Sequence, residues 1–350
     1  MAITMGDPAG SGPEIDIKAL RTIAQADAKF VLIGDLRIFK KASEVVNAND
    51  LKFVKIAHPA EAKDEPKTVN VIDLGTFDFS NLVYGKPSIS GGKAAYECIV
   101  QAVNFAKTGA VQAIVTAPIS KDALNMAGYN YPGHTELLAE LTNSEFVIMA
   151  LVLKHVKVPH VTAHVSLKEA LDLVKKERVL RTIEVTHRSL VDLFVISEPR
   201  IAVAGLNPHA GEGGLFGNEE IQEIIPAIEG ARDKGIDASG PFPPDSVFHR
   251  AYWNKEFDSV VAMYHDQGHI AMKMVGFMYG VNLTLGLPII RASPDHGTVW
   301  GKAGKGTADE RSTVEAIRLV AELAKRKLNQ KPSSCDNVTG KLPSLPPKEK

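Results

Sequence analysis

The sequence predicts an α/β fold with a largely parallel sheet. Short apolar runs rich in β-forming residues alternate with segments of helical periodicity along most of the chain. Strands separated by helices in this way are typical of α/β proteins with parallel sheets. The composition agrees, because 45% of the 350 residues are hydrophobic and 23% are charged, which is typical of a globular protein with a buried core.

The expected elements follow this alternation from the N-terminus onward. Strands are expected at AIT near the N-terminus and over residues 29–34, 113–118, 146–153, 160–165, 200–206 and 259–265. Helices are expected between them over residues 13–25, 91–107, 135–141, 167–189, 218–234 and 313–327. Pro13 suits a first helical turn, and Thr135 is placed to cap the helix that it opens. The Pro, Ser and Lys of residues 329–350 predict a flexible tail.

Charge, hydropathy and cysteine usage exclude several classes of protein. The net charge of -1 gives no electrostatic basis for a nucleic-acid or anionic-membrane partner. The longest apolar run, residues 146–153, is too short to cross a bilayer. The N-terminus lacks the pattern of a signal peptide. Cys98 and Cys335 are far apart and predict no disulfide framework, so we expect a protein of the reducing cytoplasm.

Polar clusters follow strand after strand, which predicts a functional site at one edge of the sheet. Ligands of open α/β sheets bind beyond the carboxyl ends of the strands. The clusters are MGDPAGSGPE after AIT, APISK after AIVT, AHVS after HVT, NPHAGEGG after AVAGL and HDQGH after VVAMY.

The segment GDPAGSGPE, residues 6–14, has two interpretations. Backbone amides at the start of the following helix would suit an anion or a nucleotide, and the alternative is a tight structural turn. The segment lacks the G-x-G-x-x-G pattern, so a Rossmann dinucleotide site is excluded here.

Three histidines stand at the ends of expected strands, and they are candidate metal ligands. One imidazole each from His164, His209 and His265 would leave coordination positions open for a substrate. The alternative for each residue alone is a hydrogen-bonded structural histidine. His265 and His269 have the i, i+4 spacing of a helical metal pair, but Gly268 and the strand-like run before them argue against a continuous helix. We therefore expect His269 to support the site or to face the substrate.

Other polar residues predict an anion-binding pocket with a cofactor loop beside it. Lys273, Asn282 and Arg291 stand in apolar surroundings, where a cation is costly unless it pairs with an anion, and the alternative is a snorkelling surface pair. His134 and Thr135 open a helix and would face whatever binds at its N-terminus, and the alternative is a capping turn with an incidental histidine. The Gly-rich loop over residues 293–312 could wrap a cofactor, and the alternative, a long surface loop, would be unusual at this length without a function. The expected cofactor-contacting residues are Gly286, Asp295, His296, Gly297 and Gly304.

Taken together, these stretches resemble the family of 4-hydroxythreonine-4-phosphate dehydrogenase, an enzyme of vitamin B6 biosynthesis. The motifs occur in family order from Met5 to about Asp309. They are MGDPAG-x-GPE, APISK, GHTE, GLNPHAGEGG, AMYHDQG, GVN-x-TLGLP and DHGT.

The resemblance implies a fold like that of isocitrate and isopropylmalate dehydrogenases, with a cleft between two α/β domains. One domain, on the cofactor side, is expected over residues 1–120 and 280–328, and the other, on the metal and dimer side, over residues 121–279. The resemblance also implies a homodimer in which the partner contributes to the metal site.

The resemblance implies a metal-dependent dehydrogenase that uses NAD or NADP. The residues that match the family's metal ligands are His164, His209 and His265, and they would hold one divalent ion such as Zn, Mg, Mn or Co. The residues that match its substrate contacts are His134, Thr135, Lys273, Asn282 and Arg291. Lys273 and Asp245 are our candidates for proton transfer in an oxidation followed by decarboxylation.

Two departures from the B6 enzymes bear on the substrate. Position 11 is Ser where the family's motif usually has Ile, and GHIAMKM follows YHDQ where the B6 enzymes have a more apolar segment. The chain is thus similar to a branch that oxidises D-threonate or D-erythronate 4-phosphate, which carry a hydroxyl where 4-phosphohydroxythreonine carries an amine. We hypothesise that His269 helps to read that difference. Two rival classes are a metal-dependent hydrolase and a non-catalytic ligand sensor that kept the fold.

Overall fold

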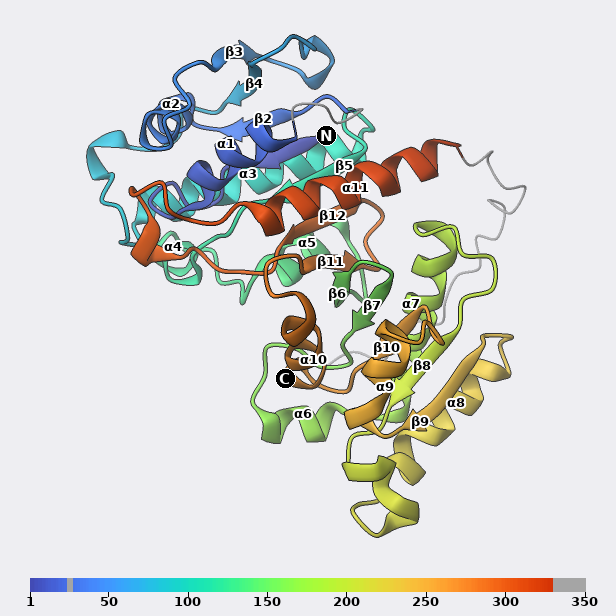
Figure 1. Cartoon of the computed structure of the whole chain (residues 1–350). Coiled ribbons are helices and arrows are strands. Elements are labelled where there is room, and N and C mark those ends of the chain that lie inside the picture. The colour runs from blue at the N-terminus through green and yellow to red at the C-terminus, as the bar shows by residue number, and fades with distance from the viewer. Residues whose placement is uncertain (24–27, 330–350) are drawn as a thin grey trace.

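A twelve-stranded mixed sheet runs through the whole molecule in the order β3-β4-β2-β1-β5-β12-β11-β6-β7-β10-β8-β9. The computed structural model describes residues 1–23 and 28–329 (Figure 1). Strand β11 pairs antiparallel with both of its neighbours, β12 and β6, and β6 pairs antiparallel with β7. All other neighbouring strands are parallel. The predicted α/β class and largely parallel sheet are therefore confirmed.

The upper half of Figure 1 is built from the first strands of the chain and from β12. Its strands are β1 (Ala2–Thr4), β2 (Val31–Gly34), β3 (Lys52–Ile56), β4 (Thr68–Asp73), β5 (Ala113–Thr116) and β12 (Ile290–Pro294). Its helices are α1 (Gly12–Thr22), α2 (Leu36–Val45), α3 (Ile89–Lys107), α4 (Lys121–Met126) and α11 (Arg311–Asn329). Short 3-10 turns occur at Pro59–Glu61, Phe79–Asn81 and Trp300–Lys302.

The middle and lower parts contain the remaining elements. Helix α5 (His134–Thr142) lies beside strands β6 (Ile148–Leu153) and β11 (Val281–Leu285) at the junction. The lower strands are β7 (Val156–Pro159), β8 (Ile201–Ala204), β9 (Ala238–Phe242) and β10 (Ser259–Val261). The lower helices are α6 (Leu167–Leu173), α7 (Lys176–Asp192), α8 (Ile225–Arg232), α9 (Pro244–Tyr252) and α10 (His265–Gly276), with a π turn at Glu220–Ile224.

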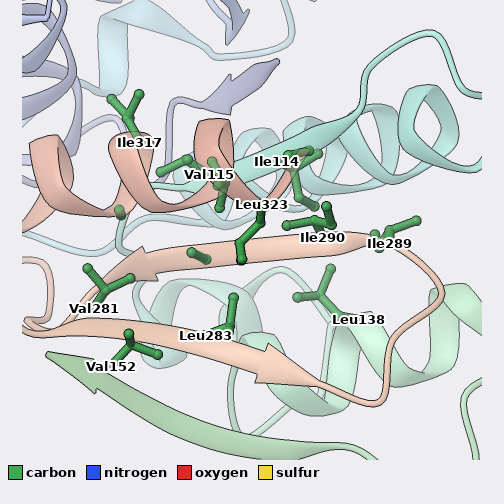
Figure 2. Close-up of a cluster of buried hydrophobic side chains, with 14 of the residues drawn as sticks. Ile114, Val115, Leu138, Val152, Val281, Leu283, Ile289, Ile290, Ile317 and Leu323 are labelled. Carbon is green, nitrogen blue, oxygen red and sulfur yellow. The ribbon is translucent and has the colours of Figure 1, made fainter. Parts of the chain in front are cut away.

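The hydrophobic core continues across the antiparallel junction. Figure 2 shows side chains of β5, β6, β11, β12, α5 and α11 meeting there. Val281 of β11 stands opposite Val152 of β6, while Ile317 and Leu323 of α11 are fully buried. Because apolar side chains fill both sides of the junction, the two halves of the sheet share one continuous core.

Three predicted elements differ from the structure. The prediction of a strand over residues 160–165 is wrong. The strand in this region is β7, which ends at Pro159 and pairs antiparallel with β6. The helix predicted over 167–189 is two helices, because Val174 and Lys175 leave the helical conformation. The strand predicted over 259–265 ends at Val261. In the described part of the chain, no helix is long and apolar enough to span a membrane.

The predicted termini of two helices fall partly outside the described residues. Helix α1 occupies residues 12–22, and residues 24 and 25 of the predicted helix lie outside the described ranges. Helix α11 extends to Asn329, so the first residue of the predicted tail is helical, and residues 330–350 lie outside the described ranges.

Candidate active site

A pocket of about 310 Å³ opens where the carboxyl ends of β5 and β12 meet the start of β11. This is the edge at which ligands of α/β sheets bind. Eleven of the predicted site residues line it: His134, Thr135, His164, His265, His269, Lys273, Asn282, Arg291, Asp295, His296 and Gly297.

Arg291 forms the buried wall of this pocket. It is 1% exposed, and its guanidinium donates to the hydroxyls of Thr116 at 2.6 Å and Thr284 at 2.9 Å. Among the described residues no carboxylate pairs with it. Burial lowers its pKa to about 9, so it remains a cation at neutral pH. A buried cation without a protein anion is a strong indication that an anionic ligand binds there.

Helix α5 points its N-terminus at the same pocket. Gly133, rather than the predicted Thr135, occupies the N-cap position, and no side chain caps the helix. His134 is the first helical residue, and its Nε2 atom is buried without a partner within the described residues. Burial, together with the charge of Arg291, holds the pKa of His134 well below its usual value. A neutral imidazole and uncapped backbone amides therefore face the cavity beside a guanidinium.

Lys273 of α10 also lines the pocket. Its Nζ atom lies 3.1 Å from Oδ2 of Asp295, and His269 Nε2 lies 3.5 Å from the other oxygen of the same carboxylate. Burial opposes ionisation of Asp295, but the contacts with His269 and Lys273 outweigh it and lower its pKa. Asp295, predicted as a cofactor contact, thus holds Lys273 in place.

His160, which the sequence did not single out, fixes the orientation of His269. It is buried, and its Nδ1 lies 3.3 Å from the Met149 carbonyl oxygen. A carbonyl only accepts, so Nδ1 carries the proton and Nε2 accepts from His269 Nδ1 at 3.2 Å. Burial lowers the pKa of His160 to about 3, which agrees with a neutral ring. Both nitrogens of His269 therefore contact protein groups.

The expected break in the helix at Gly268 is wrong. Helix α10 begins at His265 and includes His269, whose ring stacks on His265 with centroids 3.8 Å apart. A Cβ atom at Gly268 would lie 2.5 Å from His160 Nε2 and 2.7 Å from a methyl carbon of Val158. The glycine is present because the helix packs closely on β7. The pair is helical, but it does not aim two free nitrogens at one metal ion.

His164 and His265 are brought together, with ring centroids 5.7 Å apart. Two imidazoles on one tetrahedral ion have centroids roughly 5 Å apart, given a Zn–N bond of about 2 Å. Burial lowers the pKa of His164, which favours the neutral ring that binds a metal. These two residues fit a divalent ion. In residues 1–23 and 28–329, however, no group of three or more His, Cys, Asp or Glu side chains gathers into a complete metal site.

His209 does not line the pocket. It is exposed and lies on a turn in which residues 209–213 all have positive φ. The buried Glu220 carboxylate accepts the backbone N–H groups of Leu206 and Asn207, at 2.8 and 2.7 Å, and so braces this turn. Left-handed conformations cost free energy in non-glycine residues. The braced turn holds His209 on the outside of the subunit.

The predicted cofactor residues divide into two groups. His296 and Gly297 line the pocket with Asp295, and His296 Nε2 is buried without a partner in the described chain. Gly304 packs on the ring of Tyr84 outside the pocket lining. Gly286 is a tight turn at the far end of β11 from Asn282, a separation of roughly 13 Å along a strand, so the structure does not bring it to the site.

Residues 6–14 form a tight turn before α1, as one of the two interpretations expected. The amides of this turn have partners within the chain: Ala9 N donates to Asp7, Gly10 N to the Asp7 carbonyl and Ser11 N to the Thr298 carbonyl. The anion-binding interpretation of the helix start stays a prediction.

Asp245 is not placed with Lys273. It is exposed in the first turn of α9 and lines a separate groove between α9 and α10. Within one chain it therefore contacts none of the groups in the pocket that we expect to react.

Four contributors to the site were missed from the sequence. Thr116 and Thr284 hold Arg291, and their position at or near strand ends was an available signal. Lys121 of the APISK motif lines the pocket and has no ion-pair partner in the described chain. His160 had no signal, because its role depends on a contact with His269, 109 residues away.

Comparison with known proteins bears on the family of this chain. Residues 26–320 match the family described as pyridoxal phosphate biosynthetic protein PdxA. A D-threonate 4-phosphate dehydrogenase from Salmonella typhimurium is 47% identical over 324 residues, covering 93% of this chain and 98% of that protein. A 4-hydroxythreonine-4-phosphate dehydrogenase from Trichlorobacter lovleyi is 47% identical over 327 residues, covering 93% and 97%.

A solved structure is similar as well. The crystal structure of 4-hydroxythreonine-4-phosphate dehydrogenase from Klebsiella pneumoniae has a TM-score of 0.85 and 46% identity, with 93% of this chain and 97% of that chain covered. Relatives with two different substrate names match this chain at equal identity, so identity does not choose between the substrates. The family expected from the motifs is confirmed, and the chain belongs to the PdxA family of pyridoxal phosphate biosynthetic proteins.

Proposed function

We propose that this protein is a metal-dependent NAD(P) dehydrogenase that oxidises and decarboxylates a 4-phosphorylated four-carbon hydroxy acid. The observation that carries the proposal is the buried Arg291, a cation that faces the pocket without a protein anion. The similar proteins are named as dehydrogenases of phosphorylated substrates, which favours this proposal over a hydrolase or a ligand sensor.

The substrate phosphate is assigned to Arg291, His134 and the N-terminus of α5. A guanidinium and uncapped amides at a helix start are the groups that proteins use to bind phosphate. Thr135 and Asn282 line the same space, and the Oδ1 atom of Asn282 is buried without a partner in the described chain. Lys121 adds a further positive charge at the rim. This charge suits a substrate that carries both a phosphate and a carboxylate.

The proposed reaction begins at the hydroxyl β to the carboxylate. Its oxidation transfers a hydride to nicotinamide, releases a proton and gives a β-keto acid. The bond to the carboxyl carbon then breaks, CO₂ leaves, and the electron pair forms an enol that is protonated on carbon. D-Threonate or D-erythronate 4-phosphate would give dihydroxyacetone phosphate. Lys273, held by Asp295, is placed to accept or return the proton.

His164 and His265 are the residues of this chain that would hold a divalent metal, and we assign the third position to the partner subunit's His209. The exposed, braced turn that carries His209 supports donation to a second copy. A bound divalent ion lowers the pKa of a substrate hydroxyl and stabilises negative charge on oxygen. The arrangement requires a homodimer.

The cofactor is assigned to the side of the pocket formed by Asp295, His296 and Gly297 and by the loop that follows them. In this proposal residues 1–120 and 280–328 form the cofactor-side domain and residues 121–279 form the metal- and dimer-side domain. The antiparallel contact between β11 and β6 marks the boundary, and the pocket is the cleft between the domains. The unpartnered Nε2 of His296 supports a polar ligand there.

We favour a sugar-acid phosphate, and 4-phosphohydroxy-L-threonine is the alternative substrate. His269 occupies the position at which the segment departs from the B6 enzymes, and it reaches the pocket while held by His160 and Asp295. Its effect on substrate choice is therefore exerted through the position of Lys273. The substitution His269→Leu should change the ratio of the two activities, and an unchanged ratio would refute this role.

The decisive experiment measures absorbance at 340 nm with purified protein, added divalent metal, and NAD or NADP. D-Threonate 4-phosphate, D-erythronate 4-phosphate and 4-phosphohydroxy-L-threonine are compared, each with a chelator control. A coupled assay for dihydroxyacetone phosphate reports decarboxylation separately. Turnover of a sugar-acid phosphate supports the proposal, turnover of the amino substrate alone selects the alternative, and no turnover with any substrate overturns both.

A further inference from the structure

The carboxylate of Glu14 is buried at the start of α1 and binds the Gly-rich loop from inside. Glu14 is 1% exposed. One of its oxygens accepts the backbone N–H of Gly304, and the other accepts that of Gly306 at 2.7 Å. Both glycines have positive φ, 76° and 66°. A carboxylate that accepts two backbone amides at these positions selects one conformation of the loop.

The same helix start holds the loop at an earlier point. Ser11 donates both its backbone N–H, at 3.0 Å, and its hydroxyl, at 2.9 Å, to the carbonyl of Thr298. Residues 298–306 are thus attached to α1 near both ends.

The loop follows directly in the chain from the region assigned to the cofactor. Gly297, next to Thr298, lines the pocket, and Lys302 and Lys305 are exposed on the loop. Two exposed lysines on a Gly-rich loop suit an anionic dinucleotide. We propose that Glu14 and Ser11 are positioning residues that hold loop 298–306 in the conformation that binds the nicotinamide dinucleotide. This inference rests on the proposed function.

We call the contacts of Glu14 and Ser11 with loop 298–306 the clamp. The substitution Glu14→Gln tests the clamp with little change in the shape of the side chain. A glutamine offers one acceptor oxygen, so one amide keeps its partner while the side-chain NH₂ faces the second N–H donor. The loop then occupies the binding conformation for a smaller fraction of the time, and the apparent affinity for NAD(P) falls in proportion to that fraction. We expect the Kd and KM for NAD(P) to rise about tenfold or more. The kcat at saturating cofactor and the KM of the phosphorylated substrate should stay within about twofold, because neither depends on the loop once cofactor is bound.

Binding is measured directly as quenching of Trp300 fluorescence by NAD(P)H, so one readout does not depend on turnover. The substitution Trp253→Phe removes the other tryptophan and leaves Trp300, which lies on the loop, as the reporter. The matched control is Glu315→Gln, which removes a carboxylate that pairs with Arg318 on the surface of α11 and should leave the Kd unchanged.

A second variant keeps the test decisive if Glu14→Gln does not fold. Ser11→Ala removes one neutral hydrogen bond and should raise the Kd for NAD(P)H about fivefold. An unchanged Kd in the folded variants, or a KM for the phosphorylated substrate that rises as much as that for NAD(P), overturns the clamp while leaving the dehydrogenase proposal intact. If the unsubstituted protein neither binds nor reduces NAD or NADP, the proposed function fails and the clamp fails with it.

Discussion

At the scale of single residues, Arg291 is the feature of the pocket that most favours an anionic substrate. Its guanidinium is fixed by the hydroxyls of Thr116 and Thr284, so it is oriented before a ligand arrives. Preorganised cations bind planar or tetrahedral oxyanions at low entropic cost.

We predict that Arg291→Lys lowers kcat/KM for the phosphorylated substrate by about 100-fold, because a charged hydrogen bond of about 3 kcal/mol is lost. Steady-state kinetics with D-threonate 4-phosphate measures the loss. Unphosphorylated D-threonate serves as the second substrate and should show little further loss. Equal losses for the two substrates would mean that Arg291 binds the carboxylate rather than the phosphate.

Asp7 is a residue at which stability should depend on pH. It is 1% exposed, and its Oδ2 atom is buried without a partner in the described chain. Burial raises the pKa of Asp7 to about 6, although the hydrogen bond from Ala9 N opposes the shift. The folded-state pKa is above the unfolded value, so this group favours the folded state fully below about pH 4 and loses that contribution as pH rises through about 6.

We therefore predict that Asp7→Asn raises the free energy of unfolding by about 1 to 2 kcal/mol at pH 8 and by almost nothing at pH 4. The amide oxygen can still accept from Ala9 N, while the buried NH₂ limits the gain. Urea unfolding at pH 4, 6 and 8 gives the three differences. A gain that is the same at all three pH values would show that ionisation of Asp7 is not responsible.

At the scale of elements, α10 shows how tertiary packing overrides a local signal. A glycine within a helix is normally unfavourable, and Gly268 led us to expect a break. The helix continues because the missing side chain lets α10 lie against His160 and Val158. That close approach places His265, His269 and Lys273 on the wall of the pocket.

We predict that Gly268→Ala lowers the free energy of unfolding by about 2 kcal/mol, although alanine is the better helix former, because its Cβ would overlap His160. Gly230→Ala in α8 is the matched control. There the new Cβ meets only the end of the Leu180 side chain, at 3.3 Å, and the change should be neutral or stabilising by up to about 1 kcal/mol. Chemical denaturation compares the two, and similar effects would argue against a packing role for Gly268.

The sequence predicted the parts of the site that are encoded locally. His134, His164, His265 and Arg291 stand in polar or strand-end motifs, and the structure places all four on one pocket. Contacts between distant segments could not be predicted. Glu14 reaches Gly304 across 290 residues, which no local pattern reports.

Strands with mixed patterns were also missed. Strand β3 is an edge strand with two lysines, and β9 is an edge strand that contains Gly240 and Pro241. Lysine and proline are the residues that protect edge strands from pairing with other chains. They also weaken the apolar alternation by which a strand is recognised from sequence.

At the scale of the whole molecule, one continuous sheet aligns the carboxyl ends of β8 and β10. Gln267 of α10 donates to the Gly205 carbonyl at 2.8 Å and so ties the end of β8 to α10, the helix that follows β10. Even so, the left-handed turn after β8 leaves His209 on the outer surface. Exposed apolar side chains of Leu215, Phe216 and Ile221 lie near it in the chain. Both features are ones that the proposed site, shared with a second copy, would require.

Subunit complementation tests this arrangement. We predict that His209→Ala and His265→Ala each abolish activity in homodimers. After the two variants are mixed, unfolded and refolded at equal concentration, about half of the dimers are mixed, and one of the two sites in each mixed dimer is intact. Activity should then return to about a quarter of that of the unsubstituted protein. This occurs because the His209→Ala subunit keeps His164 and His265 and receives the partner subunit's His209.

If all three histidines act within one chain, mixing restores nothing. A mixture of His164→Ala with His265→Ala is the control, since both changes damage the same half of the site and every site in that mixture lacks a ligand.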